Sequence, residues 1–109
     1  MPTLLFHHSR ELGDDTLVPL MDALHHCALD SGLFEVRAIK VASLPFFHTR
    51  QGGEAKPFVM LQVRLFAGRT REQRLALSSA LLATIKEHLG EHMSATVEMV
   101  ETDRDTFSH

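Results

Sequence analysis

The sequence predicts an α+β domain in which two helices cover one face of a single β-sheet, in the order β-α-β-β-α-β. Two observations predict this two-layer sandwich: the chain contains two strand–helix–strand units, and a polar stretch with two adjacent glycines, residues 48–57, separates them. Short apolar runs indicate strands, and apolar residues that recur every three or four positions indicate helices. A chain of 109 residues is long enough for one hydrophobic core but too short for two, so a single domain over residues 1–109 is expected.

The first unit begins with a short apolar strand, Thr3–His7, and ends with a second strand, Glu35–Val41. Between them, the capping oxygens of Asp14-Asp15-Thr16 indicate a helix start, and Pro19 falls within or near the first turn. Ser31-Gly32 ends this helix, because glycine adopts the left-handed conformation of a helix end at little cost. One apolar stripe should pack on the sheet: Leu17, Leu20, Met21, Leu24, Cys27 and Ala28.

The second unit opens with Phe58–Phe66, the clearest strand in the chain. Its side chains alternate between two faces of the sheet. A helix should cover the face formed by Val59, Leu61, Val63 and Leu65. The opposite face is too apolar to lie wholly in water, which predicts a subunit interface or a pocket wall formed by Phe58, Met60, Gln62, Arg64 and Phe66.

A helix, a final strand and a polar tail complete the second unit. Thr70 and Gln73 have the spacing of a capping box at the helix start, and Gly90 ends the helix. The final strand is expected at Ala95–Glu101. The buried stripe of the helix is expected at Leu75, Ser78, Leu82, Ile85 and Leu89. A sheet covered on one face only has a bare face and two edge strands, so association with further copies is expected.

Composition and charge exclude several classes of protein. No apolar run approaches the roughly 18–20 residues that span a bilayer, and the first eight residues lack the basic start and long apolar core of a signal peptide. The single cysteine permits no internal disulfide, which fits a reducing, cytoplasmic location. The net charge of −3 and the absence of Trp and Tyr argue against nucleic acid as the main partner.

Eight histidines raise the question of a metal site. His7-His8 and His25-His26 are adjacent pairs, whose side chains diverge on a strand or a helix, and neither pair chelates easily. His88 and His92 have helical spacing, but Gly90 lies between them. Without cysteine pairs or an HExxH motif, no metal site is expected. Cys27 falls on an apolar helix stripe and is expected to be a small core residue.

Pro2 is the candidate catalytic base. If Met1 is removed, Pro2 carries a secondary amine, the one kind of backbone nitrogen that can accept a proton near neutral pH. An α-amino group titrates at about 7.7–8.0 in model peptides, and nearby cations or burial favour its neutral form. If Met1 persists, the Pro2 nitrogen is a tertiary amide without basicity, and this role fails.

Two cations are candidates for binding a carboxylate. Arg69 follows Gly68 between a strand end and a helix start, where free N–H groups and the helix dipole favour an anion. Arg69 could add a bidentate clamp there, although it could equally be a plain surface arginine. Lys40 continues an apolar strand face, which predicts either a pocket lip or a stem that lies along the surface.

The order and spacing of these features resemble the tautomerase superfamily, and most closely its 5-carboxymethyl-2-hydroxymuconate Δ-isomerase branch. The resemblance extends from Pro2 to about Asp103 and is carried by Gly32-Leu33-Phe34, Ile39-Lys40-Val41 and the strand, Ala67-Gly68-Arg69-Thr70 turn and helix of the second unit. It implies a homotrimer without metal or cofactor, in which the amino-terminal proline acts as general base on a conjugated keto–enol acid.

Carried over residue by residue, the resemblance makes Pro2 the catalytic proline, Arg69 an active-site arginine, and Lys40 the counterpart of a second family arginine. Lysine keeps the charge at that position but loses the planar fork of a guanidinium. Arg37 could compensate, but on a strand it would project to the opposite face. His7 also departs from the family, since the isomerase branch has a glutamate there, and the C-terminal tail looks shorter than in that branch.

The expected function is therefore a cofactor-independent isomerase of a small unsaturated 2-hydroxy or 2-keto acid or diacid. Lys40 and Arg69 would hold the substrate carboxylate and stabilise the dienolate that develops, and an apolar wall from Phe58, Met60 or Phe66 would exclude water. Two alternatives stay open. One is a module on the same scaffold that binds small carboxylates with little or no turnover, and the other is an assembly or metal-binding role through the histidines.

Overall fold

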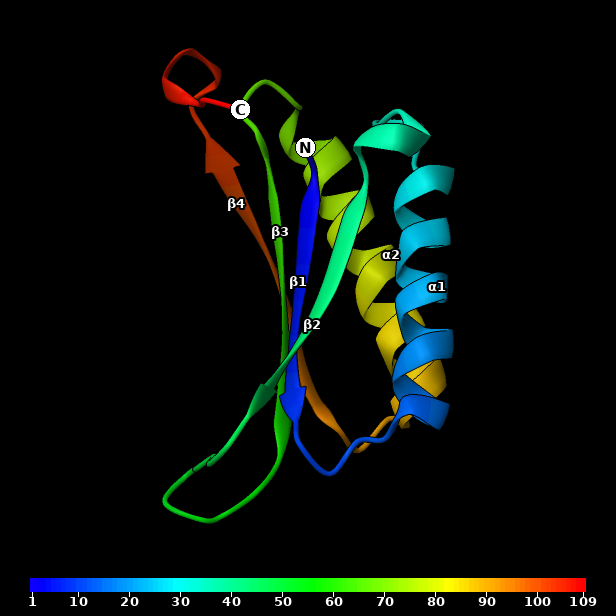
Figure 1. Ribbon diagram of the computed structural model, residues 1–109, viewed down its shortest axis with the longest axis vertical. Coiled ribbons are helices and arrows are strands. Elements are labelled where there is room, and N and C mark those ends of the chain that lie inside the picture. The colour runs from blue at the N-terminus through cyan, green and yellow to red at the C-terminus, as the bar shows by residue number, and fades with distance from the viewer.

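The computed structural model describes residues 1–109 and has the predicted order of elements (Figure 1). The four strands form one sheet in the order β2-β1-β3-β4, in which β1 pairs with β2 and β3 with β4 in parallel, while β1 and β3 are antiparallel. Both helices lie on the same side of the sheet (Figure 1). The elements are β1 (Thr3–Ser9), α1 (Asp14–Asp30), the 3-10 turn η1 (Val36–Ala38), β2 (Lys40–Phe46), β3 (Phe58–Phe66), α2 (Arg71–Leu89), β4 (Ser94–Thr102) and the 3-10 turn η2 (Arg104–Thr106). No helix combines the length and apolar character needed to cross a membrane.

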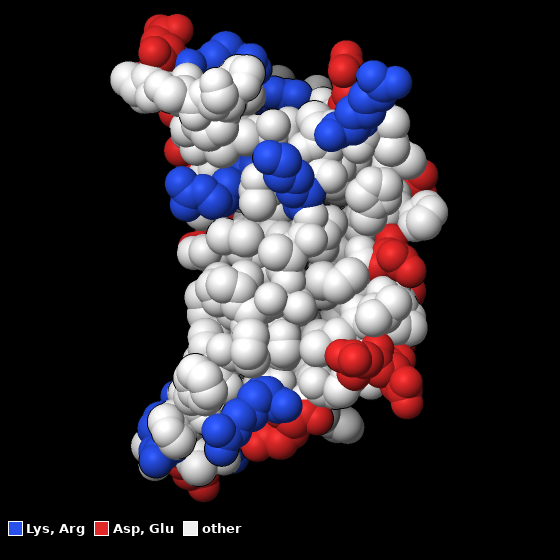
Figure 2. All heavy atoms as spheres, viewed as in Figure 1, with Lys and Arg blue, Asp and Glu red and all other residues white.

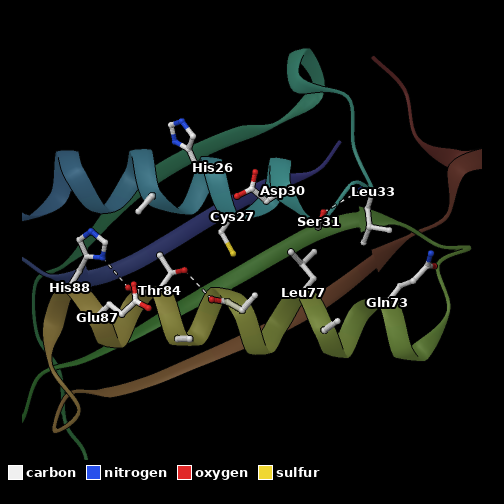
Figure 3. Close-up of a pocket in the computed structure, with 14 residues that line it drawn as sticks. His26, Cys27, Asp30, Ser31, Leu33, Gln73, Leu77, Thr84, Glu87 and His88 are labelled. Atoms are coloured by element: carbon white, nitrogen blue, oxygen red, sulfur yellow. Dashed lines mark hydrogen bonds between the residues drawn. The ribbon is translucent and has the colours of Figure 1, made fainter.

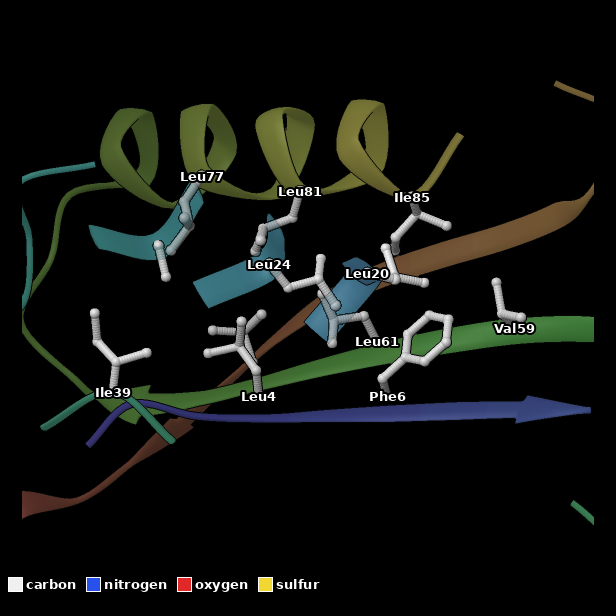
Figure 4. Packing of buried hydrophobic residues seen from close by; sticks show 12 residues of the cluster. Leu4, Phe6, Leu20, Leu24, Ile39, Val59, Leu61, Leu77, Leu81 and Ile85 are labelled. Atoms are coloured by element: carbon white, nitrogen blue, oxygen red, sulfur yellow. The ribbon is translucent and has the colours of Figure 1, made fainter. Parts of the chain in front are cut away.

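The hydrophobic core lies between the sheet and the two helices (Figure 4). The predicted helix-facing side of β3 is confirmed, since its four residues from Val59 to Leu65 are at most 1% exposed. The predicted stripe of α1 is also confirmed, with Leu20, Leu24 and Ala28 fully buried and the other members partly buried. Side chains from both helices and from β1 and β3 interlock in one cluster that includes Leu4, Phe6, Leu20, Leu24, Leu61, Leu81 and Ile85.

The second strand of the first unit differs from the prediction. Residues 36–38 form η1, in which the N–H of Ala38 donates to the carbonyl of Glu35 at 3.0 Å, and the strand begins only at Lys40. The extent of β2 follows its partner, because Thr3–Ser9 pair one to one with Lys40–Phe46. Pro45 is tolerated within β2 because this strand lies at the edge of the sheet.

The buried face of α2 was also predicted in the wrong register. Leu77, Leu81 and Ile85 face the core, whereas Leu75 is 62% exposed. The predicted stripe, which begins at Leu75, and the observed one, which begins at Leu77, both have helical spacing and share Ile85. Packing of α2 against α1 and the sheet therefore decides which of the two stripes is buried. The ends of α2 agree with the prediction: Thr70 and Gln73 form both hydrogen bonds of a capping box, at 3.1 and 2.9 Å, and Gly90 with φ of 92° ends the helix.

The start of α1 is simpler than predicted. Gly13 is the N-cap and no side chain caps the helix, although Asp14 and Asp15 place negative charge in its first turn. Pro19 lies inside the helix, shortly after its first turn. Ser31 and Gly32 end the helix as predicted, and Gly32 has the left-handed φ of 72° that favours glycine.

The second face of the sheet carries no helix. The strand register places Thr3, Leu5 and His7 of β1 on this open face, together with alternate residues of the neighbouring strands. In Figure 2 the charged side chains gather at the two ends of the molecule and along the side of α1, while the middle of the face in view is uncharged. A bare and weakly charged sheet face of this kind is suited to contact with other copies of the chain.

Candidate active site

A hollow of about 460 Å³ lies at the end of the sheet where β1 begins and β3 and β4 end. It is bordered by the connection between α1 and β2, the turn between β3 and α2, and η2. Both chain termini lie at this end of the molecule (Figure 1). Its lining combines apolar groups with three charged side chains and consists of Met1, Leu33, Phe34, Glu35, Ala38, Phe66, Arg69 and Arg104.

Pro2 is buried and follows Met1, which lines this hollow. Its side chain is less than 2% exposed, and its carbonyl accepts a hydrogen bond of 3.0 Å from the N–H of Lys40. The Pro2 nitrogen is bonded to Met1, which lines the hollow. With Met1 in place this nitrogen is an amide; without Met1, it would be an amine at the edge of the hollow.

The structure brings Arg69 to the same hollow as Met1, the residue that precedes Pro2. The Nη2 atom of Arg69 donates to the carbonyl of Leu33 at 2.7 Å, and its guanidinium carbon lies 5.4 Å from the centre of the Phe34 ring. These two contacts tie the turn after β3 to the connection after α1. The arginine is therefore positioned by segments that are 36 residues apart in the sequence.

Lys40 is not brought into the hollow. It is exposed, and it stands opposite Thr3 at the start of β2, which places it on the open face of the sheet. Its backbone contacts Pro2, but its side chain does not line the hollow. The predicted continuation of an apolar strand face was wrong, because the residues before Ile39 form η1. The strand-face argument about Arg37 fails for the same reason, since Arg37 is an exposed residue of η1.

Two further expectations about the surroundings change. Of the three proposed wall residues only Phe66 lines the hollow, because Phe58 lies at the other end of β3 and packs on Phe46 at 5.2 Å between ring centres. The start of α2 does not line the hollow either. Two of its backbone N–H groups, those of Thr70 and Gln73, already have partners in the capping box.

Arg104 is a residue of the hollow that sequence reasoning missed. It begins η2 in the segment expected to be a polar tail, and its guanidinium carbon lies 4.1 Å from the centre of the Phe66 ring. Phe66 in turn contacts Phe107 edge to face, at 5.1 Å between ring centres. A signal was present in the sequence, because Phe107 is the one apolar residue of an otherwise polar tail and lies three residues after Arg104. It was too weak to assign a position.

A second cavity, a groove, lies between the two helices (Figure 3). Its volume is larger, at about 730 Å³. Its lining includes three small residues of α2, namely Ala76, Ala80 and Ala83. Cys27 lines it and is half-buried, and it packs against the hydrophobic core as predicted. Burial raises the pKa of the Cys27 thiol above its ordinary value of 9.0, and the charges of Asp30 and Glu87 act in the same direction against an opposing hydrogen bond with Thr84.

The histidines do not converge on one site, and no group of three or more His, Cys, Asp or Glu residues is arranged to hold a metal ion. His7 and His8 point to opposite faces of the sheet. His8 is 3% exposed, and its Nδ1 lies 2.8 Å from the carbonyl of Ser9, while His7 stacks on Phe46 on the open face.

The fold is that of known tautomerases. A solved structure described as Pt0534 inactivated by 2-oxo-3-pentynoate matches with a TM-score of 0.86 and 22% identity, over 98% of this chain and 90% of that one. A native fused 4-OT matches with a TM-score of 0.83 and 25% identity, over 99% and 92%. The macrophage migration inhibitory factor of Toxoplasma gondii matches with a TM-score of 0.80 and 14% identity, over 99% and 96%.

A comparison with curated proteins gave no significant match. The model of the 5-carboxymethyl-2-hydroxymuconate isomerase family matches residues 2–107, nearly the whole chain. This protein is an isomerase of the tautomerase superfamily and belongs to the 5-carboxymethyl-2-hydroxymuconate isomerase family.

Proposed function

We propose that this protein, as a single domain over residues 1–109, is a cofactor-independent isomerase that shifts a proton within a small unsaturated 2-hydroxy or 2-keto acid. The family description favours 5-carboxymethyl-2-hydroxymuconate as the substrate. The observation that carries the proposal is the common hollow, which is lined by Arg69 and by Met1, the residue bonded to the Pro2 nitrogen.

In this mechanism the amine of Pro2, exposed by removal of Met1, takes a proton from a carbon or hydroxyl of the conjugated acid and returns it to another carbon. Arg69 holds the carboxylate next to the reacting atoms and stabilises the negative charge of the dienolate. The same positive charge disfavours the protonated amine, so that Pro2 is available as a base near neutral pH. Phe34 and Phe66 limit the access of water to the hollow.

The open face of the sheet supports assembly into a homotrimer. The fused 4-OT proteins with the same fold are described as symmetric and asymmetric trimers. Three copies that turn their open faces toward a common axis would cover the exposed sides of Phe58 and Met60. Light scattering or native mass spectrometry of the purified protein tests this assembly, and a monomer at micromolar concentration would contradict it.

The role of Pro2 is tested by measuring keto–enol conversion in the ultraviolet for Pro2→Ala beside the wild type. Loss of a well-placed general base costs about 10²–10⁴-fold in rate, and a fall of this size in kcat is expected. Thr3→Ala is the matched control, since Thr3 is the next residue but faces the open side of the sheet, and its rate should stay near that of the wild type. Equal rates for Pro2→Ala and wild type would reject Pro2 as the base.

The mass of the intact mature protein is the companion measurement. The proposal requires that the active protein lack Met1, so that the mass falls by one methionine residue. If fully active protein retains Met1, the Pro2 nitrogen is an amide in the working enzyme and the mechanism is wrong.

A module that binds carboxylates without turnover is the second candidate. The position of Lys40 favours it, because one of the two family cations is then absent from the hollow. Calorimetry that shows tight binding of an unsaturated acid, together with no conversion of any enol substrate, would support this candidate over the isomerase.

A further inference from the structure

We propose that Arg104 is a specificity-determining residue that binds a second carboxylate, so that the hollow selects dicarboxylic over monocarboxylic unsaturated acids. This inference rests on the proposed function, since it assigns to Arg104 a carboxylate of the acid that the same hollow takes. It gives the C-terminal segment a role in recognition.

The charge of the hollow favours a dianion. Arg69 and Arg104 contribute two positive charges, against one negative charge from Glu35. The ion pairs of the protein are Lys56–Glu54, Arg74–Glu101 and Lys86–Glu91, so neither arginine of the hollow is neutralised by a carboxylate. Two unpaired guanidinium groups facing one small cavity repel each other, and a ligand with two carboxylates removes that repulsion.

The two arginines differ in the donors that remain free. Arg69 already donates from Nη2 to the carbonyl of Leu33. The Arg104 guanidinium carbon lies 4.1 Å from the centre of the Phe66 ring, and Arg104 makes no side-chain hydrogen bond within the protein. A guanidinium that makes no hydrogen bond keeps its N–H groups available, and the edge of this group matches the two oxygens of a carboxylate.

Arg104 is held in place before any ligand binds. The Oδ1 atom of Asp103 accepts a hydrogen bond of 3.1 Å from the N–H of Asp105 and caps η2 at its first turn. Phe107 packs on Phe66 from the other end of η2. A cation that is fixed over an aromatic ring loses less conformational entropy on binding than a free surface arginine does, so it contributes more to selectivity.

The test compares two unreactive dienes of equal chain length, trans,trans-muconate with two carboxylates and sorbate with one. Calorimetry on the mature wild-type protein should show tighter binding of muconate. Arg104→Ala should reduce the ratio of the muconate affinity to the sorbate affinity by about tenfold or more, because it removes a charge-assisted hydrogen-bond partner of the second carboxylate. Sorbate binding should stay nearly unchanged. Arg104→Lys should restore part of the ratio, since it keeps the charge and loses the fork.

Arg37→Ala is the matched control, because Arg37 is an exposed cation of η1 that does not line the hollow; its affinity ratio should equal that of the wild type. An unchanged ratio in Arg104→Ala overturns the proposal, as does the absence of muconate binding to wild type at millimolar concentration. An equal loss of both affinities, with a lowered melting temperature, would also overturn it, by showing that Arg104 only anchors the C-terminal segment. These measurements do not depend on turnover, so a failure of Pro2 as base would appear in the rate assay and not in this ratio.

Discussion

The hollow beside Pro2 and the groove between the helices differ in size, charge and construction. The groove has the larger volume, at about 730 Å³ against about 460 Å³ for the hollow. Its charged residues, Asp30 and Glu87, are acidic, whereas the hollow holds two arginines and one glutamate. The acidic groove would therefore repel a small organic acid, and the hollow with its two arginines would attract it.

The two cavities also differ in how they are built. The groove is bounded by two helices whose small residues leave space between them. The hollow is assembled from four separate segments that converge at one end of the sheet, and its arginines are held by a backbone carbonyl and by aromatic rings. Fixed and unpaired charge, and not volume, distinguishes a place where an acid can be oriented for reaction.

Replacing Arg69 should have the largest effect that separates the two cavities. Arg69→Ala removes a charge-assisted donor set from the hollow, and kcat/KM for the enol acid is expected to fall about 10²–10³-fold. Steady-state rates followed in the ultraviolet measure this loss, and thermal unfolding checks that the contact with Leu33 has not been essential for folding.

Glu87→Gln in the groove is the control for this change, because it alters a charge of the other cavity; kcat/KM should stay within about twofold of wild type, as for most surface substitutions. A large loss in Glu87→Gln, combined with a mild effect of Arg69→Ala, would reverse the comparison and move the active site to the groove.

A smaller effect is expected for Lys40, which sequence reasoning had grouped with Pro2 and Arg69. Because its side chain is exposed on the open face, solvent and salt screen its charge from the hollow. Lys40→Ala is therefore expected to lower kcat/KM by about threefold or less, with most of the change lost at high ionic strength. A hundredfold loss that persists at high salt would show that Lys40 contacts the substrate, for example from a neighbouring copy in the trimer.

Local patterns predicted the parts of the fold that depend on neighbouring residues. The alternation from Phe58 to Phe66 gave the bounds and buried face of β3 correctly, and Thr70 and Gln73 form the capping box that their spacing indicates. The position of Arg69 in the turn between β3 and α2 was predicted correctly for the same reason, since both elements are well determined. Its approach to the N-terminus follows from the antiparallel pairing of β1 with β3.

Features that depend on distant partners could not be predicted in this way. The start of β2 is set by its pairing with β1. Lys40, which was predicted near the end of a strand, is therefore the first residue of β2. Packing against α1 and the sheet determines which of the two possible apolar stripes of α2, the one from Leu75 or the one from Leu77, is buried. Arg104 reaches the hollow because Phe107 docks on Phe66, 41 residues earlier, and no local pattern encodes that contact.

The smallest effect on activity is expected from Cys27, which gives a direct test of the groove. Because burial and the nearby acidic residues raise the pKa of its thiol, a smaller fraction of Cys27 than of a free cysteine should be thiolate at neutral pH, and iodoacetamide should label the protein slowly. Thr84→Val removes the hydrogen bond that opposes this shift, so labelling should become slower still. Since the folded protein favours the neutral thiol, the thiol's contribution to stability is present below the pKa of the unfolded chain and is lost as pH rises through the higher folded pKa.

Protein labelled at this single cysteine carries a carboxamidomethyl group in the groove and should keep its rate within about twofold, as for other changes remote from a site. Mass spectrometry measures the extent of labelling, and Cys27→Ala treated in the same way controls for modification at other residues. Activity that falls in proportion to the label in wild type, and stays constant in Cys27→Ala, would mean that the groove takes part in the reaction. Unchanged activity at full labelling would leave the hollow of Arg69 and Arg104 as the cavity in which charge, and therefore the acid, is held.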